Sequence, residues 1–295
     1  MTNTLPLGGT TYSWLYQASL TEAFAGLAEA GFCYTEITTA APHLQSPDFG
    51  TYERYSMKKL MNSLGITPVS VNPGFMDINL LSPSSDFRQL SIAHMICEIE
   101  LAADIEAPFV VAIPGRRHAL SPAPHEACQW WLEEALTRLL RRAEPLGVKI
   151  ALETSPYGYM GRGTDLLEVT DKFDHPNLGI AYDCANTLVN EDPDEGIRAV
   201  AARLLLVHMS DTWRDKWAHT SPGRGEVDFG SYADALRTIG YAAPTIYELV
   251  DLEPPMPRIR DDIAFFNKYG WDPQAPAVLD KSHRDLTLQK GMDIS

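Results

Sequence analysis

Cysteine is scarce in this chain, and the few cysteines present are far apart. The 295 residues include four of them, at positions 33, 97, 128 and 184, and no two form a Cys-x-x-Cys pair. This spacing excludes a cysteine-rich zinc module and offers no disulfide framework. We expect reduced and mostly buried thiols, as is usual in a cytosolic protein.

Basic residues are also under-represented. The chain has 24 lysines and arginines against 39 aspartates and glutamates, which gives a formal net charge of −15. An acidic surface repels phosphate backbones and anionic lipid headgroups. We therefore expect no nucleic-acid partner and no membrane partner.

Long apolar runs are missing as well. No stretch of the sequence is long enough to cross a bilayer, and the first six residues show no basic segment followed by an apolar one. A transmembrane span requires a long apolar stretch, and a secretory signal requires a basic segment followed by an apolar one. We predict neither, and the expected location is the cytoplasm.

A repeated pattern of helix, glycine and short apolar run extends along the chain. Gly31, Gly65, Gly147 and Gly240 each separate an amphipathic segment from such a run. A glycine directly after a helix can take the left-handed conformation that ends the helix, so the run that follows is a candidate strand. The candidate strands cover residues 7–12, 34–37, 67–71, 108–113, 148–153, 178–183, 204–208 and 245–248.

Strict alternation of eight strands with helices predicts parallel strands in an α/β fold, closed into a (β/α)8 TIM barrel. The alternative is an open doubly wound sheet, which usually has a glycine-rich phosphate turn after its first strand. Residues 8–14 do not match such a turn. No linker divides the chain, so we expect one barrel domain at 1–270 and a polar, loop-like C-terminal tail at 271–295.

Two of the predicted helices carry specific signals. Ser19 and Glu22 have the spacing of a capping box before the helical segment 20–30. The segment 86–104 has apolar residues at steps of three and four, which predicts one face packed on the sheet. That predicted face consists of Leu90, Ala93, Ile96, Cys97 and Leu101.

The last four predicted strands end in side chains that can bind a metal ion. These residues are Glu153, Asp183, His208 and Glu248. Adjacent parallel strands lie about 4.8 Å apart, and a barrel places its catalytic residues at the C-terminal strand ends. The four side chains can therefore converge on one divalent ion. Oxygen and nitrogen ligands without thiolate suit Mn²⁺ first, with Mg²⁺, Co²⁺ and Zn²⁺ as alternatives.

The segments around these residues carry a family resemblance. They read Ala-Leu-Glu153-Thr-Ser-Pro, Ala-Tyr-Asp183-Cys-Ala-Asn186, Val-His208-Met-Ser-Asp211 and Tyr-Glu248-Leu. Together they resemble the xylose isomerase-like TIM-barrel superfamily of sugar isomerases and epimerases, over nearly the whole chain. The resemblance implies that the four residues bind the metal. It also implies that Glu153 and Glu248 are the acid/base pair, which moves a proton on the carbon next to a carbonyl.

The resemblance and the positions of the loops also suggest substrate-binding residues, namely Arg214, Asn186, Tyr157, His118 and Glu36. The 3-epimerases of the family place a substrate-binding arginine at the position of Arg214. Many members have a histidine at the position of Asn186, and an amide can replace its hydrogen bond but not carry its proton. The segment 155–163 lacks a further glutamate of the 3-epimerases, and Tyr157 is expected to face the ligand instead.

The leading hypothesis is a metal-dependent isomerase or epimerase of a small ketose, polyol-derived keto sugar or cyclitol. The first alternative is a dehydratase of inosose or dehydroshikimate on the same scaffold, because it begins with the same proton abstraction. An enzyme like endonuclease IV and a non-enzymatic barrel that binds a sugar or a partner are two further alternatives. The expected partner is a small carbohydrate or cyclitol, and a homo-oligomer is compatible with the sequence.

Overall fold

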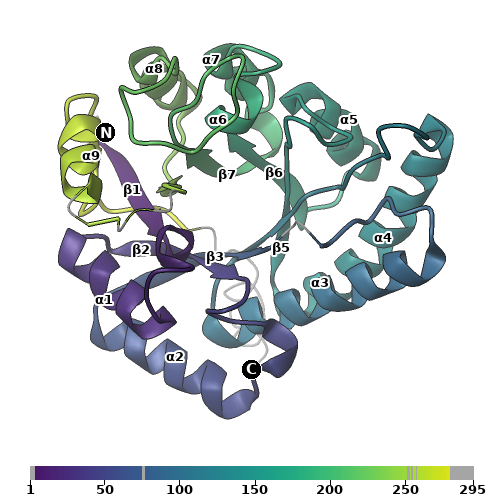
Figure 1. Cartoon of the computed structure of the whole chain (residues 1–295), viewed down its shortest axis with the longest axis horizontal. Helices are drawn as coiled ribbons and strands as arrows, with labels where there is room; N and C mark the ends of the chain where they lie inside the picture. Colours follow the sequence, from purple (N-terminus) through teal and green to yellow (C-terminus); the bar gives the residue numbers. More distant parts are fainter. Residues whose placement is uncertain (1–3, 75–76, 251–252, 254, 257, 280–295) are drawn as a thin grey trace, which may run out of the picture.

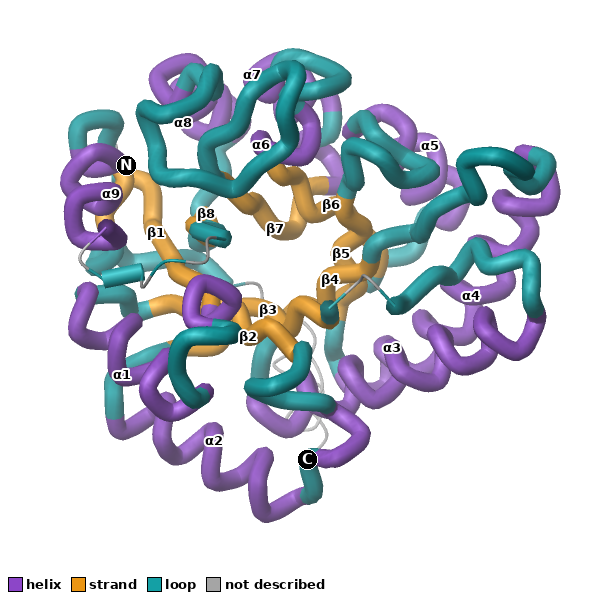
Figure 2. Tube along the Cα trace, viewed as in Figure 1, coloured by secondary structure: helices purple, strands orange, loops and turns teal. Residues whose placement is uncertain are grey.

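Eight parallel strands form a closed barrel surrounded by helices, as the sequence predicts (Figure 1). The structure is a computed structural model that describes residues 4–74, 77–250, 253, 255–256 and 258–279. The strands follow chain order around the ring, and the first strand closes it by pairing with both the second and the eighth. Figure 2 shows the ring of strands inside the ring of helices.

The bounds of the elements are as follows. The strands are β1 Leu5–Thr10, β2 Tyr34–Thr39, β3 Thr67–Pro73, β4 Phe109–Ala112, β5 Lys149–Glu153, β6 Leu178–Asp183, β7 Leu204–Met209, β8 Thr245–Tyr247 and β9 Trp271–Asp272. The helices are α1 Leu20–Ala30, α2 Thr51–Ser63, α3 Ser85–Ile105, α4 His125–Leu146, α5 Gly163–Phe173, α6 Cys184–Thr187, α7 Pro193–Ala199, α8 Phe229–Ile239 and α9 Arg258–Asn267.

Four helices of the barrel end at the glycines that the sequence predicts as helix ends. Gly31, Gly65, Gly147 and Gly240 all have positive φ angles, between 67° and 95°. This left-handed conformation ends the helix and turns the chain toward the next strand. The capping box before α1 is also present, since Ser19 and Glu22 each accept a hydrogen bond from the other's backbone N–H.

The buried face of α3 matches the predicted one only in part. Leu101 is buried as predicted, but Leu90 is 66% exposed, and Ile92, Met95, Ile99 and Ala102 also pack inward. The helix has apolar residues on both of its faces, so spacing alone did not select the face that meets the sheet. As a result, Leu90 points to the rim of the barrel instead of its core.

The first two residues of the predicted tail belong to the sheet. Trp271 and Asp272 form β9, which pairs with β1 in parallel, so a loop is the wrong description for them. Trp271 is 1% exposed, and its Nε1 donates a hydrogen bond to Thr245 Oγ1. Most of the tail that was predicted, residues 280–295, lies outside the described residues.

The interior of the barrel is filled by seven side chains from six successive strands. They are Val69, Phe109, Val111, Ala151, Ala181, Leu206 and Ile246, all buried. This layer forms a solid floor, because side chains from the strands of a small barrel pack across its axis. A ligand site in this barrel must therefore lie above the floor, at one end of the strands. No helix in the described part of the chain is long and apolar enough to cross a membrane.

Candidate metal centre and cavity

Strand geometry explains why the four predicted ligands meet. Successive side chains of a strand point to opposite faces, so residues two apart point the same way. Each ligand lies two positions beyond a residue of the barrel floor: Glu153 after Ala151, Asp183 after Ala181, His208 after Leu206 and Glu248 after Ile246. All four side chains therefore point toward the barrel axis, just above the floor.

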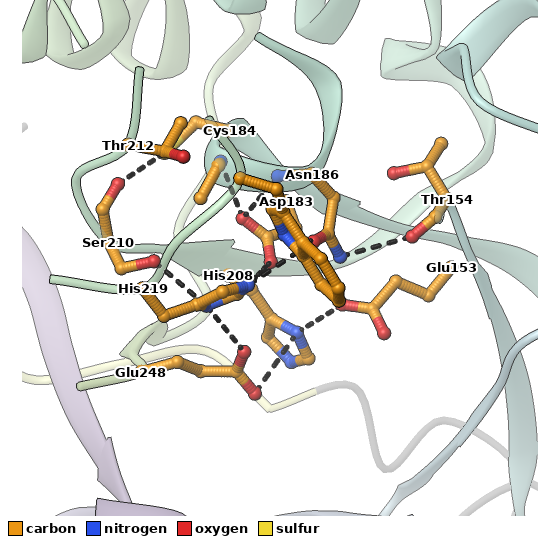
Figure 3. A network of polar contacts seen from close by, with 12 residues as sticks. Glu153, Thr154, Asp183, Cys184, Asn186, His208, Ser210, Thr212, His219 and Glu248 are labelled. Atoms are coloured by element: carbon orange, nitrogen blue, oxygen red, sulfur yellow. Dashed lines mark hydrogen bonds and ion pairs between the residues drawn. The ribbon is translucent and has the colours of Figure 1, made fainter. Parts of the chain in front are cut away.

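The four side chains form one compact cluster. Their ligand atoms all lie within 4.8 Å of one another, and each residue is at most 4% exposed. His208 Nδ1 lies 2.7 Å from Glu153 Oε1 and 3.6 Å from Glu248 Oε1. Figure 3 shows the ring of His208 between the two glutamates, which approach it from opposite sides. The cluster offers three carboxylates and one imidazole to a single point.

One oxygen of this cluster has no hydrogen-bond partner in the described structure. Asp183 is fully buried, and its Oδ1 accepts hydrogen bonds from the backbone N–H groups of Ala185 and Asn186. Its Oδ2 accepts none. A buried carboxylate oxygen is almost always satisfied, so this atom needs a partner such as a cation. The donor set suits a divalent ion of the kind predicted, and the residues therefore fit one metal ion.

Burial and mutual repulsion shift the titration of the cluster. Burial raises the pKa of Glu153 to about 7, against the opposing effect of His208. Burial and the neighbouring carboxylates also raise the pKa of Glu248. For His208, burial favours the neutral ring, but the charges of Glu36, Glu248 and Glu153 raise its pKa well above the usual range. The cluster thus holds protons at neutral pH that a metal ion must displace.

Metal binding should therefore release protons, and more of them at pH 6 than at pH 8. Ligating carboxylates and imidazoles must be deprotonated, and the raised pKa of Glu153 places its titration between these two pH values. Metal affinity should rise with pH for the same reason. Calorimetric titration of Mn²⁺ into chelator-treated protein, in two buffers of different ionisation enthalpy, measures the protons released. Identical heats in both buffers at pH 6 would contradict this prediction.

A cavity of about 810 Å³ opens above the cluster. Glu153 and Glu248 line its floor, together with Asn186 and His219. Tyr12, Tyr16 and Trp217 contribute aromatic rings to its wall, beside both apolar and polar side chains. The volume is in the range that small-molecule sites usually have, and the lining combines apolar surface with polar groups.

His219 is a site residue that the sequence analysis missed. Its Nδ1 lies 2.9 Å from Ser210 Oγ and 3.4 Å from Glu248 Oε2, and its Nε2 lies 3.2 Å from Asn186 Oδ1. The amide nitrogen of Asn186 donates to the carbonyl of Thr154, so Oδ1 faces the ring and accepts from Nε2–H. Burial lowers the pKa of His219, and the ring is a neutral donor beside the cluster.

Asp211 holds the loop that brings His219 and Trp217 into the cavity. Its carboxylate accepts hydrogen bonds from the backbone N–H groups of Thr212, Gly223, Gly225 and Val227, at 2.7 to 3.1 Å. His219 and Val250 also form a short β-bridge, which ties the loop to the chain just after Glu248. His219 follows no strand, and its only sequence signal was its place shortly before the segment Pro222-Gly-Arg-Gly225.

Of the predicted substrate-binding residues, Asn186 lines the cavity, whereas Tyr157 and Arg214 do not. Asn186 lines the cavity, and its Oδ1 also accepts a hydrogen bond from Trp217 Nε1. Tyr157 is 67% exposed and packs its ring edge-on against that tryptophan, 5.9 Å away, on the outer side. Arg214 is not in the cavity wall, because it pairs with Asp192 and donates to the carbonyl of Leu188.

His118 and Glu36 also lie outside the cavity wall. His118 is exposed, and its Nδ1 accepts hydrogen bonds from two N–H groups of its own loop, those of Leu120 and Ser121. Glu36 is fully buried behind His208, 2.9 Å from its Nε2. Burial alone would raise the pKa of Glu36, but His208 lowers it to about 2, so Glu36 is a carboxylate.

Comparison with known proteins finds both sugar epimerases and a nuclease among the relatives. The chain is 31% identical to a ketose 3-epimerase of Arthrobacter globiformis over 39% of each chain. It is 23% identical to an L-ribulose 3-epimerase of Methylomonas sp. over 86% of this chain and 87% of the other. It is also 29% identical to a probable endonuclease 4 of Chloroflexus aurantiacus, over 60% and 61% of the two chains.

Solved structures share the fold of this chain. A D-tagatose 3-epimerase-like protein superposes with a TM-score of 0.78 at 22% identity, over 90% of this chain and 99% of the other. The family model described as xylose isomerase-like TIM barrel matches residues 24–269, which include all four predicted ligands. The chain therefore belongs to the xylose isomerase-like TIM-barrel family.

Proposed function

We propose that this protein is a divalent-metal-dependent isomerase or epimerase of a small unphosphorylated ketose or cyclitol. The observation that carries the proposal is the cluster of Glu153, Asp183, His208 and Glu248 at the floor of the cavity, with ligand atoms within 4.8 Å of one another. The relatives named as ketose 3-epimerase and L-ribulose 3-epimerase support the same class of reaction.

The chemistry requires a proton to leave and return to a carbon next to a carbonyl. A bound divalent ion would polarise the carbonyl and a neighbouring hydroxyl and so acidify that carbon. Glu153 ends β5 and Glu248 directly follows β8, and the two residues line the cavity from two sides (Figure 3). One carboxylate takes the proton on one face of the substrate, and the other delivers a proton to the opposite face or to the neighbouring atom.

Two further residues orient the substrate in this proposal. Asn186 and His219 meet at the edge of the cluster, and both line the cavity. His219 holds the amide of Asn186 in place, and the second N–H of that amide can donate to a sugar hydroxyl without a change of protonation state. The nearby indole of Trp217 offers a flat apolar surface to the ring or chain of the substrate.

The charge of the cavity favours an unphosphorylated substrate. None of the described residues that line it is a lysine or an arginine, whereas Asp77, Glu153 and Glu248 are acidic. Apart from the metal ion itself, a phosphate group would find no lysine or arginine among these residues and would be repelled by their carboxylates. Neutral polyhydroxy compounds match this lining better than sugar phosphates do.

The endonuclease alternative has less support in the structure. In the described part of the chain, the only group of three or more metal-binding side chains is the cluster already named. The formal charge of −15 also opposes binding to a phosphate backbone. We retain the dehydratase alternative as an outcome of the experiment, because its first step is the same proton abstraction.

The reaction can be tested with ketoses and inososes in D₂O with added Mn²⁺. We expect a product of the same composition as the substrate that carries deuterium on the carbon next to the carbonyl. An enone product that absorbs in the ultraviolet, formed with loss of water, would instead identify a dehydratase. Binding of these compounds without turnover or exchange would rule out the proposed enzymatic function.

A further inference from the structure

Glu36 is a buried carboxylate whose position requires an explanation, because burial of a charge is costly without hydrogen-bond partners. It lies on β2, is fully buried, and does not line the cavity. Three groups donate hydrogen bonds to it: Ser70 Oγ at 2.7 Å, Asn72 Nδ2 at 2.9 Å and His208 Nε2 at 2.9 Å. Ser70 is its partner in the register of β2 and β3, so the sheet itself fixes the carboxylate.

The contact with His208 crosses the barrel. β2 and β7 are separated in the ring by β8 and β1, and Figure 2 shows them on opposite sides of it. The two nitrogens of the imidazole face different partners. Nε2 faces Glu36, whereas Nδ1 faces Glu153 and Glu248. The nitrogen that can bind the metal is therefore Nδ1, and the other nitrogen carries a proton toward Glu36.

We propose that Glu36 is a positioning residue, which holds His208 with its proton on Nε2 and so presents Nδ1 to the metal ion. A carboxylate in this position fixes the tautomer and the orientation of the ring and makes the free nitrogen a stronger ligand. The inference rests on the proposed metal centre but not on the identity of the substrate. It replaces the substrate-binding role expected for Glu36.

The surroundings of Glu36 require a carboxylate and not an amide. All three neighbours donate, and they do so to both oxygens: Asn72 to Oε1, and Ser70 and His208 to Oε2. A glutamine has one oxygen and one NH₂ group. If its NH₂ faced Asn72, two donors would oppose each other, and turning the Asn72 amide over would direct its oxygen at Glu248, to which Nδ2 also donates. If it faced His208, the ring would carry its proton on Nδ1, which would block the nitrogen that faces the other ligands.

The chain offers a matched control for this test. Glu98 on α3 is also fully buried, and it also binds one serine and one histidine: Ser46 Oγ at 2.5 Å and His94 Nε2 at 2.9 Å. Neither Ser46 nor His94 belongs to the metal cluster. Glu98→Gln therefore reports the cost of changing a buried carboxylate without touching a ligand.

The experiment compares Glu36→Gln, Glu98→Gln and the unmodified chain by calorimetric titration with Mn²⁺ and by thermal unfolding. We expect Glu36→Gln to raise the Kd for the metal by about 10–100-fold. Glu98→Gln should leave the Kd within about twofold, whatever its effect on the unfolding midpoint. An unchanged Kd in Glu36→Gln, or equal losses in both variants, would overturn the inference. Failure of the unmodified chain to bind Mn²⁺ would instead count against the proposed function.

A second measurement observes the ring of His208 directly in the unmodified chain. In ¹⁵N-histidine-labelled protein with Zn²⁺ bound, His208 should show a ring N–H at Nε2, shifted downfield by its hydrogen bond, and a metal-bound Nδ1. The His208→Gln variant assigns the signal by its loss. Binding of the metal through Nε2, or a ring without a proton at that nitrogen, would refute the role of Glu36.

Discussion

Replacing Glu153 or Glu248 by glutamine should lower kcat/KM by about 10²–10⁴-fold, the usual contribution of a general acid or base. An amide keeps the size of the side chain but cannot accept the substrate proton. Both residues line the cavity and both belong to the cluster, so each change also weakens a metal ligand. Assays at saturating Mn²⁺, with the metal content measured, separate these two effects.

The two variants should differ in how they exchange protons with solvent. If the glutamates act on opposite faces, each variant keeps a base for one of the two epimers and loses it for the other. Exchange of deuterium into each epimer, followed by NMR, measures this. Glu191→Gln is a suitable control, because Glu191 accepts hydrogen bonds from Tyr182 and Gly163 and does not line the cavity. Turnover within tenfold of the unmodified chain in both site variants would refute the acid/base assignment.

Removing the metal should abolish turnover and also destabilise the fold. Without a cation, the buried acidic groups of Glu153, Asp183 and Glu248 crowd one point inside the barrel, and their burial and mutual repulsion raise the pKa of Glu153 and of Glu248. A ligand at a hundred times its Kd stabilises the folded state by about 2.7 kcal/mol. We therefore expect chelation to lower the unfolding midpoint by several degrees, and Mn²⁺ to restore both the midpoint and the activity.

The control for chelation is the variant Asp183→Asn. It keeps the hydrogen bonds that Oδ1 accepts, but it places an NH₂ group, which cannot bind a metal ion, where the oxygen without a hydrogen-bond partner lies. Its unfolding midpoint should respond much less to Mn²⁺. Activity that survives complete removal of divalent ions would contradict a metal-dependent mechanism.

The barrel and its ligand set could be predicted because both follow from periodic rules. Parallel strands share one C-terminal edge, and residues two apart on a strand share one direction. From the sequence alone, those rules predict that the side chains of Glu153, Asp183, His208 and Glu248 converge on one point. The glycine signals worked for a similar reason, since a left-handed residue after a helix is a local requirement.

The remaining site residues depend on contacts that are not periodic. The second strand was predicted to end at residue 37, but it runs to Thr39, so Glu36 lies below the rim and within the barrel. His219 reaches the cluster through a loop anchored on Asp211, and no local sequence pattern predicts the course of that loop. Arg214 has the spacing of a substrate ligand, yet Asp192 holds it elsewhere. Spacing thus predicted direction along a strand but not the course of a loop.

The most direct test of a single metal centre is a titration of chelator-treated protein with Mn²⁺, followed by calorimetry. The structure predicts one tight site per chain in the unmodified protein, and loss of that site in Asp183→Asn, since the four ligands converge on one point. No binding to the unmodified chain, or two or more tight sites that survive in the variant, would contradict the account.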